Sequence, residues 1–388
     1  MKIGIDCRLW DETGVGRYIR NLVLNLQKLD KKNSYVLFVL GKDREEILNS
    51  SKRTFLLRGG TVQNDKFKII EVDIRWHSLE EQIKFPQILN RENLDLVHFP
   101  YFSVPLFYNK PFVVTIHDLI LHHFSTGEAS TLPSPIYSLK LLGYKFVIKK
   151  ATQKARKIIA VSNATKKEIV DHLGIKSDKV AVTYEGVDEK VQSSKLKVKS
   201  LVKSKYFLYV GNAYPHKNLE RLLEAFKAVN SDLNLVFVGK EDYFYKRLKT
   251  KVEKMGLAGR VKFLQNIADE ELSSLYKNAL ALVLPSLMEG FGLPALEAMA
   301  NKCLVLASDI PSLKETCGNA ALYFNPFNVN ELVGKLNIAT SHTTEYGGLE
   351  ELRKKGIERA KMFSWEKMAK ETLEVYEKIS YSRIDANT

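Results

Sequence analysis

The sequence predicts an α/β fold of two doubly wound parallel sheets, and three observations support that prediction. Short apolar runs typical of buried strands alternate with amphipathic helical segments, as in βαβ units. The alternation stops in a polar, lysine-rich stretch at residues 191–205 and then begins again. Glycine-containing turns follow several strands, at the edge where such sheets bind ligands. The length of 388 residues also exceeds what one hydrophobic core ordinarily holds, so two domains are expected.

The first half combines strand-like apolar runs with helices whose apolar positions recur at helical spacing. The expected strands are Lys2–Asp6, Tyr35–Leu40, Lys68–Val72, Leu94–Phe99, Phe112–Ile116 and Lys157–Val161. The expected helices are Arg17–Leu29, Leu79–Asn90 and Asn163–Leu173, the last ending at a left-handed Gly174.

The second half repeats the same alternation. Its expected strands are Tyr206–Val210, Leu233–Val238, Val261–Leu264, Leu280–Leu284 and Leu304–Ala307. Its expected helices are Leu219–Val229, Phe244–Met255, Asp269–Asn278 and Pro294–Ala300, followed by an amphipathic C-terminal helix that Ser364 caps.

These elements divide the chain into five parts. We expect an N-terminal Rossmann-like domain at residues 1–190, a linker at 191–205 and a second Rossmann-like domain at 206–363. The C-terminal helix is expected at 364–380, with a tail at 381–388.

The composition is that of a globular protein, with 45% hydrophobic and 27% charged residues. No apolar run approaches the roughly 20 residues that a membrane span requires. The chain starts in a strand pattern without signal-peptide features, and Cys7, Cys303 and Cys317 have neither paired nor metal-ligand spacing. These features predict a cytoplasmic protein with reduced thiols.

The formal net charge of +14 is unusual. It suits a nucleic acid, an acidic membrane surface or a polyanionic substrate, but it also fits ordinary lysine-rich helix faces in water. No nucleic-acid-binding module is visible, so we expect no nucleic-acid partner.

The most informative motif is Glu289-Gly-Phe-Gly-Leu-Pro-Ala-Leu-Glu297, which follows a buried strand and opens a helix. Its two glycines allow backbone N–H groups at the helix N-terminus to face an anion such as a phosphate. The two carboxylates are better suited to hydroxyl groups. A nucleotide diphosphate joined to a sugar satisfies both halves of such a site.

This motif resembles the E-x7-E motif of family 4 (GT4) among the retaining GT-B glycosyltransferases, which includes mannosyl- and glucosyltransferases. The resemblance implies that Glu289 holds sugar hydroxyls and that Glu297 holds the ribose. It also places the donor's phosphates near the turn formed by Gly290, Phe291, Gly292 and Leu293. The resemblance extends from the N-terminus to about residue 376.

A second motif follows the strand that ends near Gly211. Lys217 stands at the mouth of the next helix, where its charge and the helix dipole suit a diphosphate. In the resembled family a lysine in this loop holds the leaving phosphates. Many relatives also have an arginine just after the glycine, where this chain has Asn212.

The remaining candidates lie in the N-terminal half. Gly14 and Gly16 open the first helix and resemble the family's glycine loop near the donor phosphates or the acceptor. His117 follows a buried strand and matches the histidine that contacts the donor sugar, although a general base or a core histidine are alternatives. Asp118 and Tyr101 are candidates for acceptor binding.

The resemblance implies a metal-independent, retaining hexosyltransferase that uses GDP-mannose or a UDP-hexose and needs no cofactor. Its acceptor is expected to be a saccharide or a lipid-linked saccharide. Another GT-B enzyme, such as an epimerase or a phosphorylase, and a non-catalytic sugar-nucleotide-binding subunit are the alternatives. Residues 137–157 mix large apolar residues with lysines, which predicts weak, peripheral attraction to anionic membranes at the inner face of the plasma membrane. The alternative is that Leu141, Phe146 and Ile148 pack against the sheet.

Overall fold

The computed structural model of the chain describes residues 1–49, 66–125, 134–187, 202, 204–229, 232–340 and 348–384. The chain forms two compact units. The first consists of Met1–Leu119, Ser138–Glu185 and Trp365–Thr388, and the second consists of Ile120–Tyr137 and Gly186–Ser364. The linker expected at 191–205 lies largely outside the described residues.

The first unit is built on a parallel sheet of seven strands in the order β3-β2-β1-β4-β5-β6-β7. This order places the chain reversal between β1 and β4, as in a doubly wound fold. The strands are β1 (Lys2–Asp6), β2 (Ser34–Val39), β3 (Phe67–Glu71), β4 (Leu96–Phe99), β5 (Phe112–Ile116), β6 (Lys157–Ala160) and β7 (Val180–Val182).

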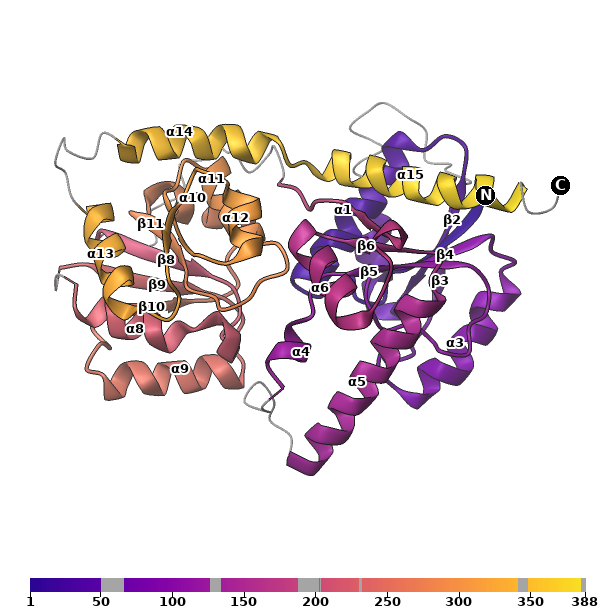
Figure 1. Cartoon of the computed structure of the whole chain (residues 1–388), viewed down its shortest axis with the longest axis horizontal. Helices are drawn as coiled ribbons and strands as arrows, with labels where there is room; N and C mark the ends of the chain where they lie inside the picture. The colour runs from indigo at the N-terminus through magenta and orange to yellow at the C-terminus, as the bar shows by residue number, and fades with distance from the viewer. Residues whose placement is uncertain are drawn as a thin grey trace. The chain divides into compact units, whose positions relative to one another are not determined.

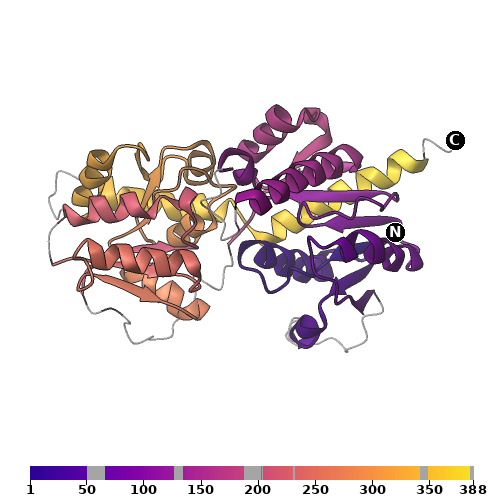
Figure 2. The same cartoon turned by 90° about the horizontal axis from the view of Figure 1, so that it is seen from below.

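Helices cover both faces of this sheet. Helix α15 packs beside α1, as both views show (Figures 1 and 2), while α3, α5 and α6 contribute to the hydrophobic core on the other face. The helices are α1 (Gly14–Leu29), α3 (Leu79–Arg91), α5 (Ser134–Lys154), α6 (Asn163–Leu173) and α15 (Trp365–Ile384), with short 3-10 turns at η1 (Gly41–Asp43) and η2 (Ser177–Lys179).

The core of the first unit follows from the alternation of side chains along each strand. Val36 and Phe38 on β2 point to the face covered by α3, where they meet Phe85 and Leu89. On the same face, Ile148 of α5 is fully buried. Parallel strands that are buried on both faces read as nearly continuous apolar runs, which is why they were visible in the sequence.

The second unit repeats the arrangement with six parallel strands in the order β10-β9-β8-β11-β12-β13. The strands are β8 (Tyr206–Val210), β9 (Asn234–Val238), β10 (Val261–Leu264), β11 (Ala281–Leu284), β12 (Val305–Ser308) and β13 (Leu322–Phe324). Its helices are α4 (Ile120–His123), η3 (Pro215–Lys217), α8 (Leu219–Lys227), α9 (Tyr243–Lys254), α10 (Asp269–Asn278), α11 (Leu293–Ala300), α12 (Pro311–Cys317), α13 (Val329–Thr340) and α14 (Gly348–Lys361). Helices α8 and α9 lie on one side of the strands and α10, α11 and α14 on the other (Figure 1).

The predicted fold class is confirmed: the chain forms two doubly wound parallel sheets. The expected strands and helices are present, and most of their ends differ by no more than a few residues. Helix α15 continues to Ile384, beyond the expected end at residue 380. The sequence did not reveal β7 or β13, because each strand has only three residues.

Among the described residues, every helix is too short or too polar to cross a lipid bilayer.

Candidate active site

The centre of the second sheet, where β8 and β11 lie side by side, positions the two charged residues that the sequence singled out. In doubly wound sheets, ligands bind beyond the carboxyl ends of the strands at the point where the strand order reverses. Lys217 lies in η3, shortly after β8, and Glu289 lies in the loop after β11. Both are therefore at this reversal point.

Lys217 and Glu289 form a buried ion pair. The Lys217 Nζ lies 2.7 Å from each carboxylate oxygen of Glu289, and the Ser286 hydroxyl donates to Oε1 at 2.7 Å. The two side chains are only 15% and 12% exposed. Lysine carries three donor hydrogens, so one remains for another acceptor.

The environment keeps Glu289 ionised. Burial alone would raise the pKa of this carboxyl, but the charge and hydrogen bonds of Lys217 and the Ser286 hydroxyl outweigh burial and lower it. The neighbouring His216 has the opposite behaviour: burial and the nearby Lys217 charge lower its pKa to about 4, so its imidazole is neutral at pH 7. The surroundings thus favour a charged carboxylate at Glu289 and a neutral ring at His216.

Hydrogen bonds fix the two loops against each other. Asn218 adopts a left-handed conformation, and its side-chain amide donates to the carbonyls of Pro285 and Pro326 at 3.0 and 2.9 Å. The Leu287 N–H donates to the His216 carbonyl at 2.8 Å. The sequence analysis missed Asn218, although an asparagine beside Lys217 at the start of a helix was a usable signal.

The strand end before Lys217 is held by two tyrosines. The Tyr245 hydroxyl donates to the Gly211 carbonyl and the Tyr209 hydroxyl to the Asn212 carbonyl, both at 2.6 Å. Gly211 has a φ of +147°, which only glycine adopts without strain. The Asn212 side chain makes a long contact of 3.5 Å with the Tyr214 N–H, so its amide remains available to a ligand beside Lys217.

The glycine turn delivers helix α11 as the sequence predicts. Gly292 is the N-cap of α11 with a φ of +102°, and a Cβ there would lie 2.6 Å from Leu313. Phe291 is buried, and its carbonyl accepts a hydrogen bond from the Thr316 hydroxyl. Gly290 and Leu293 flank these residues and are half-buried. Helix α11 therefore begins directly after the loop that carries Glu289. Pro294 has no N–H and the Ala295 N–H donates to the Gly292 carbonyl at 2.9 Å, so the Leu293 N–H is the group at this helix start that has no acceptor within the helix.

Glu297 lies in the second turn of α11 and is buried. Its Oε2 accepts a hydrogen bond of 2.8 Å from the Tyr276 hydroxyl on α10. The role of Glu297 toward a ribose stays a prediction. Tyr276, which orients the carboxylate, was not found from the sequence because it belongs to a different helix without a motif.

In the first unit, His117 stands at the carboxyl end of β5 between two acceptors. Its Nε2 lies 2.9 Å from the Pro100 carbonyl oxygen, and its Nδ1 lies 3.2 Å from Glu185 Oε1. A carbonyl only accepts, so Nε2 carries a hydrogen, and the carboxylate favours a second one on Nδ1. Burial lowers the pKa of His117, but the bond and charge of Glu185 outweigh burial and raise it.

Both ring nitrogens thus face acceptors, an arrangement that favours a doubly protonated imidazole over the neutral ring that a general base requires. Tyr18 packs its ring edge-on against the imidazole at a centroid distance of 5.1 Å. Glu185, which orients His117, was missed by the sequence analysis. Its position just after β7 was the available signal, but that three-residue strand was not recognised.

The other N-terminal candidates differ in accessibility. Asp118 and Tyr101 are half-buried. Gly14 is exposed, with open space where a Cβ would lie. Gly16 is buried, and a Cβ there would lie 2.4 Å from the Trp10 carbonyl oxygen. Packing thus accounts for glycine at position 16.

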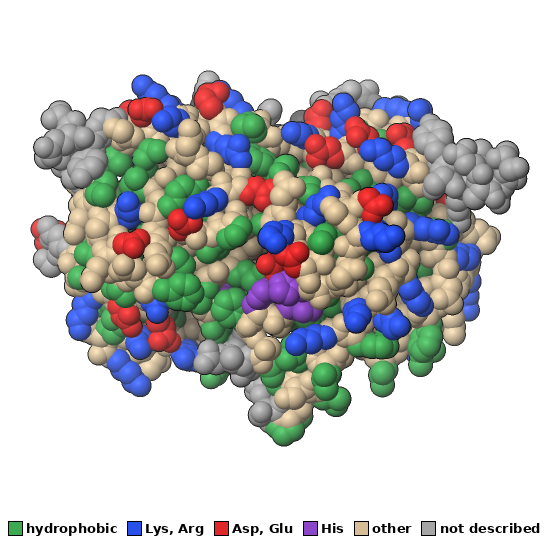
Figure 3. All heavy atoms as spheres, viewed as in Figure 1, with side chains coloured by type: hydrophobic (Ala, Val, Ile, Leu, Met, Phe, Trp, Pro, Cys, Tyr) green, Lys and Arg blue, Asp and Glu red, His purple; other side chains and the backbone are tan. Residues whose placement is uncertain are grey.

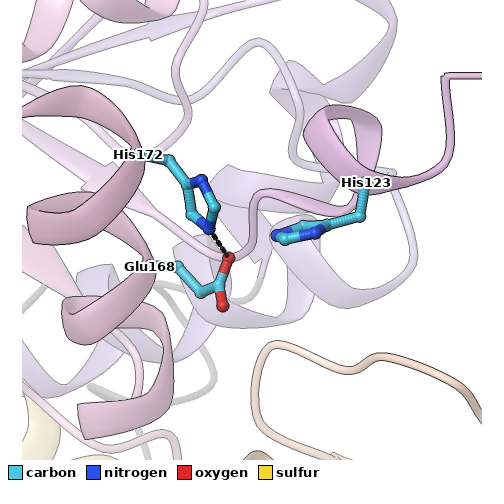
Figure 4. A group of neighbouring side chains, drawn as sticks. All are labelled: His123, Glu168 and His172. Atoms are coloured by element: carbon cyan, nitrogen blue, oxygen red, sulfur yellow. Dashed lines mark ion pairs between the residues drawn. The ribbon is translucent and has the colours of Figure 1, made fainter.

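A separate carboxylate–histidine pair lies on α6, where Glu168 Oε2 and His172 Nε2 are 3.3 Å apart (Figure 4). The residues are one helical turn apart, and a histidine in the last turn suits the helix dipole. His123, also drawn in Figure 4, belongs to the other compact unit. Neither unit alone brings together three such metal-ligand side chains among the described residues.

Comparison with known proteins agrees with the fold and the motifs. The family model described as Glycosyltransferase Family 4 matches residues 13–191, and the model described as Glycosyl transferases group 1 matches residues 192–363. The chain is 32% identical over 252 residues to the O-antigen chain mannosyltransferase RfbU of Salmonella typhimurium, a match that spans 65% of each chain. It is 25% identical over 386 residues to the O-antigen chain mannosyltransferase B of Escherichia coli, covering 94% of this chain and 96% of that one.

Solved structures share the architecture. Sucrose-phosphate synthase from Thermosynechococcus elongatus superposes with a TM-score of 0.77 at 20% identity, covering 98% of this chain and 100% of the other. Anabaena HepE in complex with UDP-glucose superposes with a TM-score of 0.74 at 16% identity, covering 97% and 100%. The two parallel sheets therefore define a GT-B fold, the class of protein that the sequence predicted.

Within that class the chain belongs to family 4 of the glycosyltransferases. The predicted resemblance is confirmed, and the protein is a glycosyltransferase. The individual roles assigned to its site residues stay predictions.

The charge of His117 predicts a pH dependence of stability. Its folded-state pKa is raised above the ordinary 6.5, so its contribution is fully present below about pH 6.5 and is lost as the pH rises through the folded-state value. We expect the difference in unfolding free energy between wild type and His117→Gln, measured in urea, to shrink as the pH rises from about 6 to about 9. Glu185→Gln should abolish the trend, and a difference that grows with pH would contradict a charged His117.

Proposed function

We propose that this glycosyltransferase moves a hexose of the mannose or glucose type, with retention, from a nucleotide-diphosphate sugar to a saccharide or lipid-linked saccharide. GDP-mannose and UDP-hexoses are the proposed donors, and cell-surface polysaccharide or glycoconjugate synthesis is the proposed setting. The observation that carries this proposal is the buried Lys217–Glu289 pair at the strand-order reversal, immediately before the N-terminus of α11. The O-antigen mannosyltransferase names of the relatives support it.

The pair offers each half of a sugar nucleotide a complementary group. In the structure, Lys217 and Glu289 satisfy each other. A bound diphosphate would compete for the Lys217 ammonium, and sugar hydroxyls would replace the hydrogen bonds that Glu289 accepts. Lys217 and the backbone N–H groups near Phe291–Leu293 would then stabilise the negative charge that develops on the leaving phosphate as the bond to the sugar breaks.

The charge state of His117 bears on the path of the proton. The acceptor hydroxyl must lose a proton when its oxygen bonds to the sugar, and a doubly protonated imidazole is unable to take it. We assign that proton to the departing phosphate oxygen, which is consistent with attack from the face of departure and with retention. His117 is then a donor or a positive charge toward the sugar, and Asp118 and Tyr101 are proposed acceptor contacts.

We also propose peripheral association with an anionic membrane at the inner face of the plasma membrane, through α5. Its fully buried Ile148 packs in the core, but Leu139, Leu142 and Phe146 on the opposite face are 72%, 65% and 55% exposed. The alternative that Phe146 packs against the sheet is therefore wrong, whereas it holds for Ile148. We call the exposed stripe of Leu139, Leu142 and Phe146 the α5 surface.

The surroundings of the α5 surface suit a lipid interface. Lys145, Lys149 and Lys150 flank the stripe, and residues 138–157 include no acidic residue. Figure 3 shows hydrophobic and Lys or Arg side chains together over α5 and α3. The same unit has further exposed apolar residues on α3 and in the loop before β5, namely Leu79, Ile83 and Phe107. Apolar area combined with clustered cations is the recipe for interfacial binding.

Lys217→Ala and Glu289→Ala should each lower kcat/KM by about 100-fold or more, the scale of losing one aligned electrostatic contact. The assay is release of free nucleotide, which should require an added acceptor. Lys262→Ala, which removes an exposed lysine of the same unit, is the control and should behave as wild type. Near wild-type transfer by a folded Lys217→Ala protein would refute the role of the pair.

Transfer should survive EDTA, because Lys217 and the helix dipole at the start of α11 provide the positive charge that the leaving diphosphate requires. The measurement is the initial rate with and without chelator, followed by addition of Mg²⁺ or Mn²⁺. Complete loss that either ion restores would contradict this account of the leaving group.

The double variant Leu142→Ser/Phe146→Ser should reduce binding to anionic liposomes by about tenfold or more, because each residue loses apolar area available for burial. Cosedimentation at low and high salt measures this, and wild-type binding should fall with salt. Phe327→Ser, at a residue 69% exposed in the other unit, is the control. Wild-type protein that stays in the supernatant at low salt would show that the α5 surface does not bind lipid.

A further inference from the structure

A basic pocket lies at the amino-terminal edge of the first sheet, opposite the edge that carries His117. Four cationic residues line it: Arg156, Lys157, Lys176 and Lys179. Its volume is about 460 Å³. Strand β6 begins at Lys157 and β7 begins directly after Lys179, which fixes the pocket at the start of both strands. It is thus separate from the candidate active site of this unit.

Two of the four cations are held by backbone carbonyls. The Lys179 Nζ donates to the Gln153 carbonyl at 2.6 Å, near the end of α5, and the Lys157 Nζ donates to the Asp178 carbonyl at 2.7 Å. Helices α5 and α6 both end at this edge, and carbonyl-rich helix ends attract cations. These neutral acceptors orient the ammonium groups without cancelling their charge, and each lysine retains further donor hydrogens.

The other two cations have no side-chain partner in the part of the chain that the structure describes. Neither Arg156 nor Lys176 forms an ion pair or a side-chain hydrogen bond there. Asp178 also lines the pocket, but its carboxylate pairs with none of the described lysines or arginines. Burial, and then repulsion from Arg156, lower the pKa of Lys179. The cations therefore oppose one another, and the lining sets four cationic side chains against the single carboxylate of Asp178.

We propose that this pocket binds a phosphate-type oxyanion, with a diphosphate group as the best match to its charge. A guanidinium supplies a fixed fork of N–H donors for phosphate oxygens, and the ammonium groups supply point charges around it. A dianion or trianion would remove the repulsion among the four cations, which a neutral ligand would not do. The phosphate group has two possible sources, a soluble phosphorylated metabolite or the head group of an anionic lipid.

Anion binding in the basic pocket does not depend on the transfer reaction proposed above. The residues replaced to test it lie outside the candidate active site. Arg156→Gln/Lys176→Gln removes the two cations without side-chain partners and leaves the bonds of Lys157 and Lys179 intact. Arg91→Gln/Lys32→Gln removes two exposed cations elsewhere in the same unit and is the charge-matched control. The probe is inorganic pyrophosphate, titrated into the full-length protein by isothermal calorimetry.

Wild type and control should bind pyrophosphate with the same dissociation constant. The pocket variant should show no such binding, or a dissociation constant at least about tenfold higher, since charge-assisted hydrogen bonds are lost. The Lys217→Ala protein should retain wild-type binding, which separates it from binding at the candidate active site. The proposal is overturned if the isotherms of wild type and pocket variant coincide.

Thermal unfolding distinguishes ligand binding from a purely structural role of the cations. Without ligand, the pocket variant should melt at the wild-type temperature or above it, because repulsion is relieved. Pyrophosphate should raise the melting temperature of wild type and control more than that of the pocket variant. The proposal is overturned if the pocket variant melts several degrees below wild type without ligand and pyrophosphate raises both melting temperatures equally.

Vesicles identify the source of the phosphate. Phosphatidylcholine vesicles with and without phosphatidic acid are cosedimented with wild type and pocket variant, both of which keep the α5 surface intact. Selective loss of binding to phosphatidic acid by the pocket variant assigns the pocket to a lipid head group. Equal sedimentation, together with lost pyrophosphate binding, assigns it to a soluble phosphorylated ligand.

Discussion

The ion pair between Lys217 and Glu289 joins the two loops on which the proposed donor site depends. Removing either partner would leave the other charge buried and uncompensated, which typically costs about 3–5 kcal/mol. The pair thus preserves both charges in a place where burial would otherwise neutralise them. Hydrogen bonds from Asn218 and Leu287 hold the loops in the register that allows the pair to form. Binding a ligand here means exchanging partners between groups that are already ionised and positioned.

The histidines show how the surroundings determine the charge of one side-chain type. Burial and the nearby His117 lower the pKa of His98 to about 3, and its ring nitrogens contact the hydroxyls of Tyr376 and Thr115. These partners both donate and accept, so they tolerate a neutral ring. His117 is equally buried but faces a carboxylate and a carbonyl, which favour the charged form. The surroundings of the two histidines, on β4 and just after β5, thus favour opposite charge states.

The sequence predicted the fold class and the position of each main candidate, because every candidate follows directly on a buried strand. It did not predict that Lys217 and Glu289 contact each other, since they are 72 residues apart and meet only because β8 and β11 are neighbours. Glu185 and Tyr276 were missed for the same reason: their partners come from other elements. Helix α5 was ambiguous because apolar residues occupy both of its faces, so helical periodicity did not separate the buried Ile148 from the exposed Leu142.

Helix α15 makes the first unit discontinuous in sequence, and this affects the order in which the chain folds. The second unit includes the continuous stretch Gly186–Ser364, whereas the first needs Trp365–Thr388 beside its opening residues. During translation from the N-terminus, the first unit lacks the helix that supplies Tyr376 until the continuous stretch Gly186–Ser364 of the second unit has been synthesised. The surface of α1 that receives α15 is uncovered until then, so a ribosome-bound nascent chain would complete its second unit before its first.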